Sequence, residues 1–328
     1  MSIQLTIIGL DKIGVSLGLA LQKQTEKITR VGHDRKSEIH KKAQELNAID
    51  EAPGKILKAV ENADIVLLSL PVDEIEDTIS VIAPVLKPGA VLLDTSPLKI
   101  QVSEWVKQNL PEDRYFVTFH PTLNPKYLHE NSTDLDFAHD DLFHKSNIII
   151  SGDPSTDGDA VKLATDLARL IGSKPFFADP YEVDGLVAAT EILPRLTAAA
   201  YLHAVMKQPG WKEAQKVAGT SFKMMADEAN RQLERENFGT SVLSNKENSI
   251  RTINNMMIAL HDLRTIIESD DENGLKDWYE YAMDQSKNWE KERMKADWDN
   301  LDDYSNLPTT GDFFARMLGF KKRKPKKS

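Results

Sequence analysis

Two glycines near the N-terminus have the spacing of a nucleotide-binding turn. In the stretch IIGLDKIG, Gly9 and Gly14 take the first and last places of the pattern G-x-G-x-x-G. In this pattern a strand turns into a helix and the backbone approaches a pyrophosphate. Asp34 stands 20 residues after Gly14, where an acid hydrogen-bonds the ribose hydroxyls and repels a 2′-phosphate. The spacing predicts a dinucleotide site that favours NAD over NADP, although the adjacent Arg35 is a candidate partner for a 2′-phosphate.

The middle place of the pattern holds Asp11 instead of glycine. A side chain with a negative charge opposes the approach of a pyrophosphate, so we expect weakened cofactor binding, with Lys12 offsetting part of the charge. The other expected cofactor contacts lie in this turn and after later strands: Ile13, Leu70, Pro71 and Asp94. The alternative interpretation is that both glycines only mark the boundary between a strand and a helix.

Two later residues have side chains that can relay a proton. His120 lies near the end of the apolar stretch RYFVTFHP, and Ser96 ends the stretch GAVLLDTS. When a hydride leaves a carbinol carbon, the hydroxyl proton needs an acceptor, and neutral imidazole fills that role near pH 7. Without further context, His120 would equally be a histidine bonded to backbone, and Ser96 a turn or cap residue before Pro97.

Alternating elements position these residues over the first 150 positions. The expected strands are residues 5–9, 28–34, 63–71, 89–96, 114–121 and 147–154, and the expected helices are residues 13–24, 37–46 and 74–86. This alternation predicts parallel pairing in an α/β, Rossmann-type doubly wound sheet. The ligand of such a sheet lies at the carboxyl ends of its strands, where the residues named above are expected.

The pattern changes after about residue 180. From Val183 to Trp298 a period of 3.6 residues dominates, which is typical of amphipathic helices. We therefore predict a dinucleotide-binding Rossmann domain at residues 1–175 and an all-helical domain at residues 176–298 that supplies substrate and dimer contacts. Residues 299–328 are expected to form a flexible linker and a basic tail.

The composition is that of a globular chain with 41% apolar residues and no cysteine, which excludes thiolate catalysis and fits a cytoplasmic location. The net charge is −10 although the tail KKRKPKKS carries six basic residues. An acidic body argues against specific nucleic-acid binding, and the tail is a candidate for weak contact with anionic surfaces. The spacing of His129, His139 and His144 fits no closed metal site, so we expect none.

Four motifs in order resemble the prephenate and arogenate dehydrogenases of tyrosine biosynthesis. The stretches IIGLDKIGVSLGLAL, LLDTSPLK, FHP and VDGLVAATEILPRL stand where that family typically has GLGLIGGSLA, D-x-x-S-x-K, HPMAG, and HD followed by SHLPH. The resemblance covers roughly residues 3–295. It implies an NAD-dependent oxidoreductase that oxidises a ring carbinol and removes a carboxylate as the ring becomes aromatic. It also implies that His120 is the catalytic histidine and that Ser96 hydrogen-bonds both the histidine and the substrate hydroxyl.

The substrate motifs depart from the family pattern. HPMAG has become HPTLN, which puts Asn124 in the place of the glycine, and SHLPH has become EILPR, which puts Ile192 and Arg195 in the places of histidines. The family arginine that holds a substrate carboxylate has no clear counterpart, and the candidate cations are Arg195, Lys223 and Arg251. With Ser96 and His120, Asn124 and these cations are the candidate substrate contacts.

Three functions remain open on these grounds. The leading hypothesis is a homodimeric dehydrogenase that acts on prephenate or arogenate. The second is a non-catalytic, cofactor-binding regulatory homologue, which the departures of the substrate motifs from the family pattern support. The third is a dehydrogenase of another small hydroxy acid, such as a β-hydroxyacid enzyme, whose usual catalytic lysine in the helical domain is not evident in this sequence.

Overall fold

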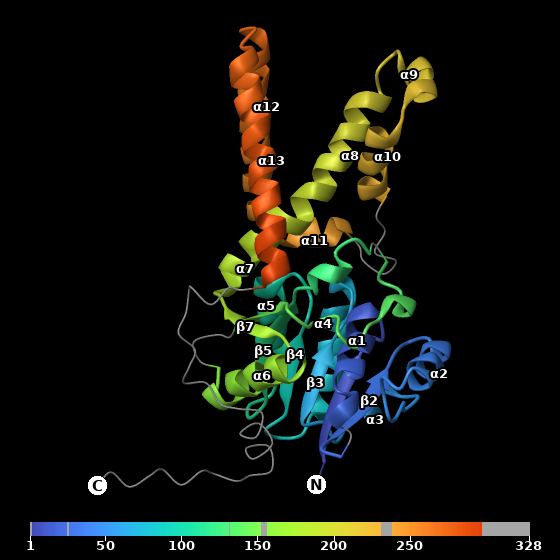
Figure 1. Cartoon of the computed structure of the whole chain (residues 1–328). Coiled ribbons are helices and arrows are strands. Elements are labelled where there is room, and N and C mark those ends of the chain that lie inside the picture. The colour runs from blue at the N-terminus through green and yellow to red at the C-terminus, as the bar shows by residue number, and fades with distance from the viewer. Residues whose placement is uncertain (1, 25, 131, 152–155, 231–237, 297–328) are drawn as a thin grey trace, which may run out of the picture. The chain divides into compact units, whose positions relative to one another are not determined.

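The computed structural model describes the chain except residues 1, 25, 131, 152–155, 231–237 and 297–328 (Figure 1). The described residues form two compact units, one reaching from the N-terminus to Pro180 and the other spanning Tyr181–Lys295. The expected linker at 299–312, Trp298 and the basic tail at 321–328 lie outside the described residues.

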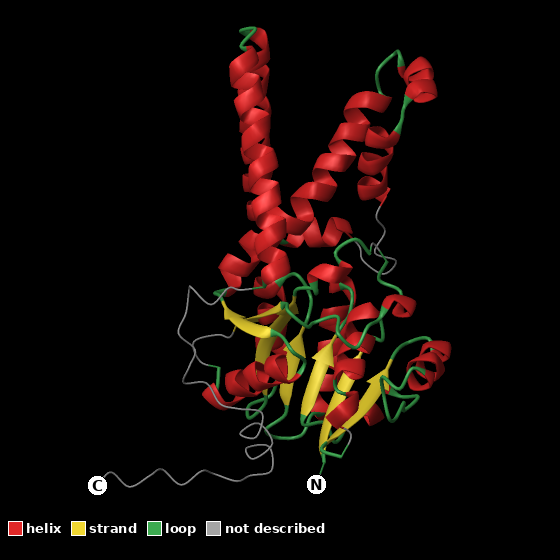
Figure 2. Ribbon diagram, viewed as in Figure 1, coloured by secondary structure: helices red, strands yellow, loops and turns green. Residues whose placement is uncertain are grey.

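A seven-stranded sheet forms the centre of the first unit, in the order β2-β1-β3-β4-β5-β6-β7 (Figures 1 and 2). The strands are β1 (Ile3–Ile8), β2 (Ile28–His33), β3 (Ile65–Leu68), β4 (Val91–Asp94), β5 (Tyr115–Pro121), β6 (Asn147–Ser151) and β7 (Lys174–Phe177). The pairs among β1 to β5 are parallel. The predicted Rossmann-type sheet is confirmed.

The last two strands differ from the sequence prediction. Strand β6 runs antiparallel to β5, because residues 122–146 join them through the short turns η3 (Pro125–Tyr127) and η4 (Leu135–Phe137) without a crossover α-helix. Strand β7 pairs parallel to β6 at the edge of the sheet. Its sequence KPFF contains a proline and is partly exposed, so it lacks the buried apolar run that marks the other strands.

Helices cover both faces of the sheet in this unit (Figure 2). They are α1 (Lys12–Ala20), α2 (Ser37–Glu45), α3 (Ile56–Val60), α4 (Val72–Ile82), α5 (Lys99–Asn109) and α6 (Gly158–Leu170), with the short turns η1 (Gln22–Gln24) and η2 (Ala83–Val85). Ile7 packs in a buried cluster with residues of α1 and α6. Ile8, the next residue, packs in another cluster with residues of α4 and α5. Alternation along buried strands thus supplies a core on each face.

The second unit is helical throughout its described residues, as predicted. Its elements are α7 (Pro180–Val187), the π-helical turn η5 (Ala188–Ile192), α8 (Leu193–Met206), α9 (Trp211–Val217), α10 (Thr220–Asn230), α11 (Phe238–Ser244), α12 (Lys246–Glu268) and α13 (Glu272–Lys295). Helices α12 and α13 run alongside each other and are joined by a tight turn (Figure 1). Among the described helices, none has both the length and the apolar character needed to cross a bilayer.

Candidate active site

Both glycines of the opening turn are required by close backbone packing. Gly9 has φ +92°, and a Cβ atom there would lie 1.9 Å from the carbonyl oxygen of Ser69. A Cβ atom on Gly14 would lie 2.2 Å from the carbonyl oxygen of Gly9. Any side chain at either place would therefore collide with the main chain. The first and last places of the dinucleotide pattern have the backbone roles that the pattern demands.

Asp11 is the N-cap of α1 in this structure. Its Oδ1 atom accepts a hydrogen bond from the Gly14 backbone N–H at 2.9 Å and another from the Ser69 hydroxyl at 2.7 Å. The backbone of Asp11 is extended, with φ −82° and ψ −173°, a conformation that does not require glycine. The residue is tolerated because it caps the helix. Its carboxylate also occupies the electropositive helix end that favours a bound phosphate.

The structure corrects the expectation that Lys12 offsets part of the negative charge of Asp11. Lys12 is 3% exposed, and its ammonium lies 2.7 Å from the Glu130 carboxylate. A buried ammonium needs a close carboxylate, and the β5–β6 segment (residues 122–146) supplies it. The imidazole of His139 lies 3.0 Å from the same carboxylate and stacks on Tyr127. Burial alone would raise the pKa of Glu130, but hydrogen bonds from Lys12 and His139 outweigh burial and lower it.

The β5–β6 segment also contacts the backbone and first turns of α1. The N–H of Lys12 donates to the Thr133 carbonyl at 2.9 Å, and the N–H of His139 donates to the Ser16 hydroxyl at 3.0 Å. The bond from Lys12 to Thr133 and the bond from Gly14 to Asp11 engage N–H donors of the turn that face a pyrophosphate in a working site. The glycines fit a dinucleotide, whereas Asp11 and the β5–β6 segment compete for part of its phosphate contacts. Sequence reasoning missed this segment.

Asp34 lies directly after β2 and beside the opening turn. Its carboxylate accepts hydrogen bonds from the backbone N–H groups of Leu10 at 3.1 Å and Lys36 at 3.0 Å. The guanidinium of Arg35 lies 2.9 Å from the Glu74 carboxylate. A negative group thus stands where a ribose would bind, and the neighbouring cation already has an acidic partner. Of the other expected cofactor contacts, Ile13 lies in the first turn of α1, and Leu70 and Pro71 follow β3.

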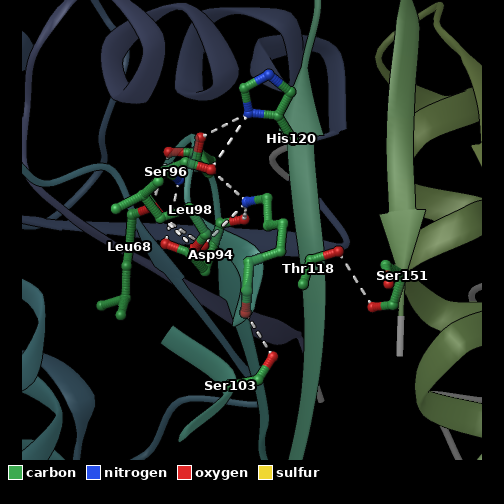
Figure 3. A network of polar contacts seen from close by, with 10 residues as sticks. Leu68, Asp94, Ser96, Leu98, Ser103, Thr118, His120 and Ser151 are labelled. Carbon is green, nitrogen blue, oxygen red and sulfur yellow. Dashed lines mark hydrogen bonds and ion pairs between the residues drawn. The ribbon is translucent and has the colours of Figure 1, made fainter. Parts of the chain in front are cut away.

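The ends of β4 and β5 bring a second polar group together (Figure 3). Asp94, the last residue of β4, pairs in register with Thr118 of β5. This register places the loop after Asp94 beside His120, two residues further along β5. Lys99 opens α5 and reaches back to Asp94, with 3.0 Å between its ammonium and the carboxylate Oδ2. Both side chains are 0% exposed, so an ion pair is buried directly beneath the loop.

The hydrogen-bond partners of His120 define its tautomer. Its Nδ1 atom lies 3.3 Å from the carbonyl oxygen of Thr95 and 3.3 Å from that of Ser96, and the residue is 8% exposed. Carbonyl oxygens can only accept hydrogen bonds, so Nδ1 must carry the hydrogen. The neutral imidazole then has its lone pair on Nε2, at the edge of the ring that points away from the loop (Figure 3). This tautomer suits a base that acts through Nε2.

Ser96 has a different contact from the one that the family resemblance implies. Its hydroxyl lies 2.8 Å from Asp94 Oδ2, and its carbonyl oxygen is the atom that faces His120. Counted from Asp94, the serine place in D-x-x-S-x-K is position 97, which holds proline, while Lys99 takes the lysine place. The assignment of Ser96 to the family serine is therefore one residue out of register. Counting from Asp94 in the sequence would have revealed it.

Asn124 contributes to the fold of the β5–β6 segment. Its amide group donates to the Asp141 carbonyl at 3.0 Å, and its side-chain oxygen accepts from the Lys126 backbone N–H at 3.1 Å. The residue is buried at the start of η3. Its carboxamide therefore has a local structural function.

No group of three or more potential ligands suited to a metal ion occurs among the described residues.

The remaining candidates belong to the helical unit and lie on three different helices. The Arg195 guanidinium of α8 lies 3.7 Å from the centre of the Phe238 ring. Lys223 of α10 is exposed and pairs with Asp227 one turn later. Arg251 of α12 donates to Asn248 Oδ1 at 2.9 Å. Ile192 is buried in η5, which fits the loss of a polar side chain at this place of the motif.

Comparisons with known proteins show a similarity to one family. Residues 17–176 match the family described as "Prephenate dehydrogenase, nucleotide-binding domain". Over these residues, the chain is similar to the prephenate dehydrogenase family. It is 29% identical over 194 residues to a cyclohexadienyl dehydrogenase of Zymomonas mobilis, covering 59% of this chain and 64% of that protein. A prephenate dehydrogenase of Bacillus subtilis is 23% identical over 294 residues, covering 84% of this chain and 73% of that protein.

The fold is similar to that of a solved structure. A structure of Aquifex aeolicus prephenate dehydrogenase, in complex with hydroxyphenyl propionate and NAD+, superposes with a TM-score of 0.76 at 22% identity, covering 88% of this chain and 98% of that one. The match to the Zymomonas protein spans less than two thirds of its length. The family match begins after the turn that holds Asp11, so this unusual turn lies outside the matched residues.

Proposed function

We propose that the protein is an NAD-dependent oxidoreductase that oxidatively decarboxylates prephenate or arogenate. The observation that carries the proposal is the imidazole of His120, with Nδ1 directed at two carbonyl oxygens on the carboxyl edge of the sheet that also carries the nucleotide turn. The names of the two relatives, cyclohexadienyl dehydrogenase and prephenate dehydrogenase, support the same substrate class.

In the proposed reaction, the residues of this chain bind, orient and deprotonate. Bound NAD would supply the hydride acceptor. Asp34 would accept hydrogen bonds from the ribose hydroxyls, and Gly9 and Gly14 would let the backbone approach the dinucleotide. His120 Nε2 would take the proton from the substrate hydroxyl as that carbon becomes a carbonyl. Loss of the ring carboxylate would then make the ring aromatic, which drives the reaction forward.

NAD is preferred over NADP in this proposal because of charge. A 2′-phosphate next to Asp34 would meet a carboxylate at close range, and Arg35 is paired with Glu74. Arg195, Lys223 and Arg251 are retained as proposed partners of the substrate carboxylates. A cation is needed there because prephenate carries two carboxylates.

A homodimer formed through the helical unit is part of the proposal. Large apolar side chains are exposed along α12 and α13, namely Ile250, Met257, Ile258, Leu260, Ile267, Tyr281, Met283 and Trp289. Exposed apolar surface of this extent is typical of protein–protein contacts. Sedimentation or light scattering of the purified protein would test the dimer, and a monomer at micromolar concentration would contradict it.

A cytoplasmic location and weak binding of the basic tail to anionic surfaces also remain expectations.

The direct test is turnover by the purified full-length chain. Prephenate and arogenate should each be offered with NAD and with NADP, and reduced nicotinamide followed by absorbance. We expect turnover with NAD and at least one of the two substrates, and loss of most of it in the variant His120→Asn. An inactive parent protein that still binds NAD in calorimetry would contradict the proposal.

That result would favour the second candidate function, a non-catalytic regulatory homologue that binds the cofactor. Two observations support this candidate. Pro97 stands in the place of the family serine, and the Asp11 carboxylate occupies the N-terminal end of α1. Turnover of a different small hydroxy acid, with none of prephenate or arogenate, would instead support the third candidate.

A further inference from the structure

Lys99, at the start of α5, forms a fully buried ion pair with Asp94. The ammonium lies 3.0 Å from Asp94 Oδ2 and 3.3 Å from the Asp94 carbonyl oxygen, and it also donates to the carbonyl oxygen of Ser96. Neither charged side chain is exposed at all. A buried ion pair loses the hydration of both charges and commonly adds little stability over an apolar pair. Stability alone therefore does not account for this buried pair.

The carbonyl oxygen of Ser96 joins this ion pair to the proposed base. It accepts from the Lys99 ammonium, and it also lies 3.3 Å from His120 Nδ1. A carbonyl oxygen has two lone pairs, so both donors can be accommodated at once. Figure 3 shows the imidazole of His120 beside Ser96. One backbone atom is thus the contact shared by a fixed cation and the histidine.

Asp94 holds the same residue, Ser96, through other atoms. Its Oδ1 atom accepts from the Ser96 backbone N–H at 3.1 Å, and its Oδ2 atom accepts from the Ser96 hydroxyl at 2.8 Å. The two charged residues therefore clamp Ser96 through its N–H, its hydroxyl and its carbonyl group. If Lys99 were lost, the carbonyl would be free to turn, and His120 would lose one of the two acceptors for Nδ1–H.

We propose that Lys99 is a positioning residue for His120: its ammonium fixes the Ser96 carbonyl to which Nδ1–H donates, and this contact selects the tautomer with the lone pair on Nε2. The inference rests on the proposed function for its catalytic consequence only. The structural part, the link from Lys99 to the tautomer of His120, is measurable without turnover. Lys99 itself does not touch the reacting atoms in this proposal.

The first test needs no substitution at Lys99. Magnetic resonance of the ring nitrogens in isotope-labelled histidine distinguishes the two neutral tautomers, and the variant His120→Asn identifies the signal. In the parent protein, with the ring neutral, we expect the hydrogen on Nδ1. A hydrogen on Nε2 would overturn the proposal whatever the enzyme does.

The second test removes the clamp while keeping the interior neutral. The double variant Asp94→Asn/Lys99→Met leaves no unpaired buried charge, whereas Lys99→Met alone would strand the Asp94 carboxylate. We expect His120 to populate both tautomers in the double variant. Ser103→Ala is the matched control, because the Ser103 hydroxyl bonds to the backbone carbonyl of Lys99, at 2.7 Å, and the ammonium stays in place. The control should keep the parent tautomer.

Turnover separates this inference from the proposed function. In an active parent, we expect the double variant to lower kcat about 10- to 100-fold, the scale of a misplaced catalytic group, with little change in KM. A folded double variant that keeps the parent tautomer and kcat would overturn the role of Lys99 and leave the function intact. An inactive parent with the predicted tautomer change would overturn the function and leave the link intact. If the double variant does not fold, a parent spectrum with the hydrogen on Nε2 would still overturn the proposal.

Discussion

The Asp11 carboxylate accepts a hydrogen bond from the Gly14 N–H at 2.9 Å, so that an anion of the chain itself caps the helix end that would receive a pyrophosphate. The cap stabilises α1, and the same charge opposes a bound phosphate. The two effects are separable by substitution, because an uncharged oxygen can also cap a helix. We therefore expect Asp11 to raise the stability of α1 and to lower the affinity for the cofactor.

Asp11→Ser should tighten NAD binding without unfolding the turn. Serine keeps a cap acceptor for the Gly14 N–H but removes the charge. We expect a gain on the order of 1 kcal/mol, the scale of a local charge at a helix end, measured by calorimetry. Asp11→Ala is the matched control, because it also removes the charge but loses the cap, with a cost of about 1 kcal/mol in the free energy of unfolding. Equal NAD affinity of Asp11→Ser and the parent would show that the carboxylate does not face the phosphates.

Asp34→Ala should narrow the preference for NAD over NADP. The substitution removes the carboxylate that would repel a 2′-phosphate and hydrogen-bond the ribose. NAD should bind more weakly and NADP more tightly. Adding Glu74→Gln should favour NADP further, because it removes the charged partner of Arg35. Calorimetry with both cofactors measures each step, and tighter binding of NADP than of NAD by the parent protein would contradict the prediction at the outset.

The contact between Glu130 and Lys12 should weaken in acid. Hydrogen bonds from Lys12 and His139 hold the pKa of Glu130 below its ordinary value of 4.5. A depressed carboxyl pKa contributes stability above the unfolded value, and this stability is lost as the pH falls through the folded value. At about pH 6 the parent should have a higher thermal midpoint than Glu130→Gln. This difference in midpoint should shrink towards about pH 3. A difference that stays constant with pH would contradict it.

Local patterns in the sequence predict much of the first unit, and contacts distant in the chain explain what they miss. The buried runs of β1, β3 and β4 and the turn glycines are readable because a strand between two helical layers is apolar throughout. Asp11 as a helix cap was also readable, since aspartate is a preferred N-cap. The pairing of Lys12 with Glu130 was not, because the two residues lie 118 positions apart. Nor does any local pattern reveal that β6 turns back against β5.

His120→Asn should lower kcat by roughly 10² to 10⁴, the range for a positioned general base. The affinity for NAD should barely change, because the imidazole is proposed to address the substrate hydroxyl and not the dinucleotide. Asparagine keeps a donor that can reach the Thr95 and Ser96 carbonyl oxygens, so the loop should remain folded.

Ser96→Ala should cause a smaller loss of kcat than His120→Asn, because the Ser96 hydroxyl bonds to Asp94 and the carbonyl that faces His120 is retained. Steady-state kinetics for kcat and KM, with calorimetry for NAD, measure all of these quantities. A parent that turns over prephenate or arogenate while His120→Asn runs at the full rate would remove His120 from the mechanism. In that case the base would have to be sought on another element.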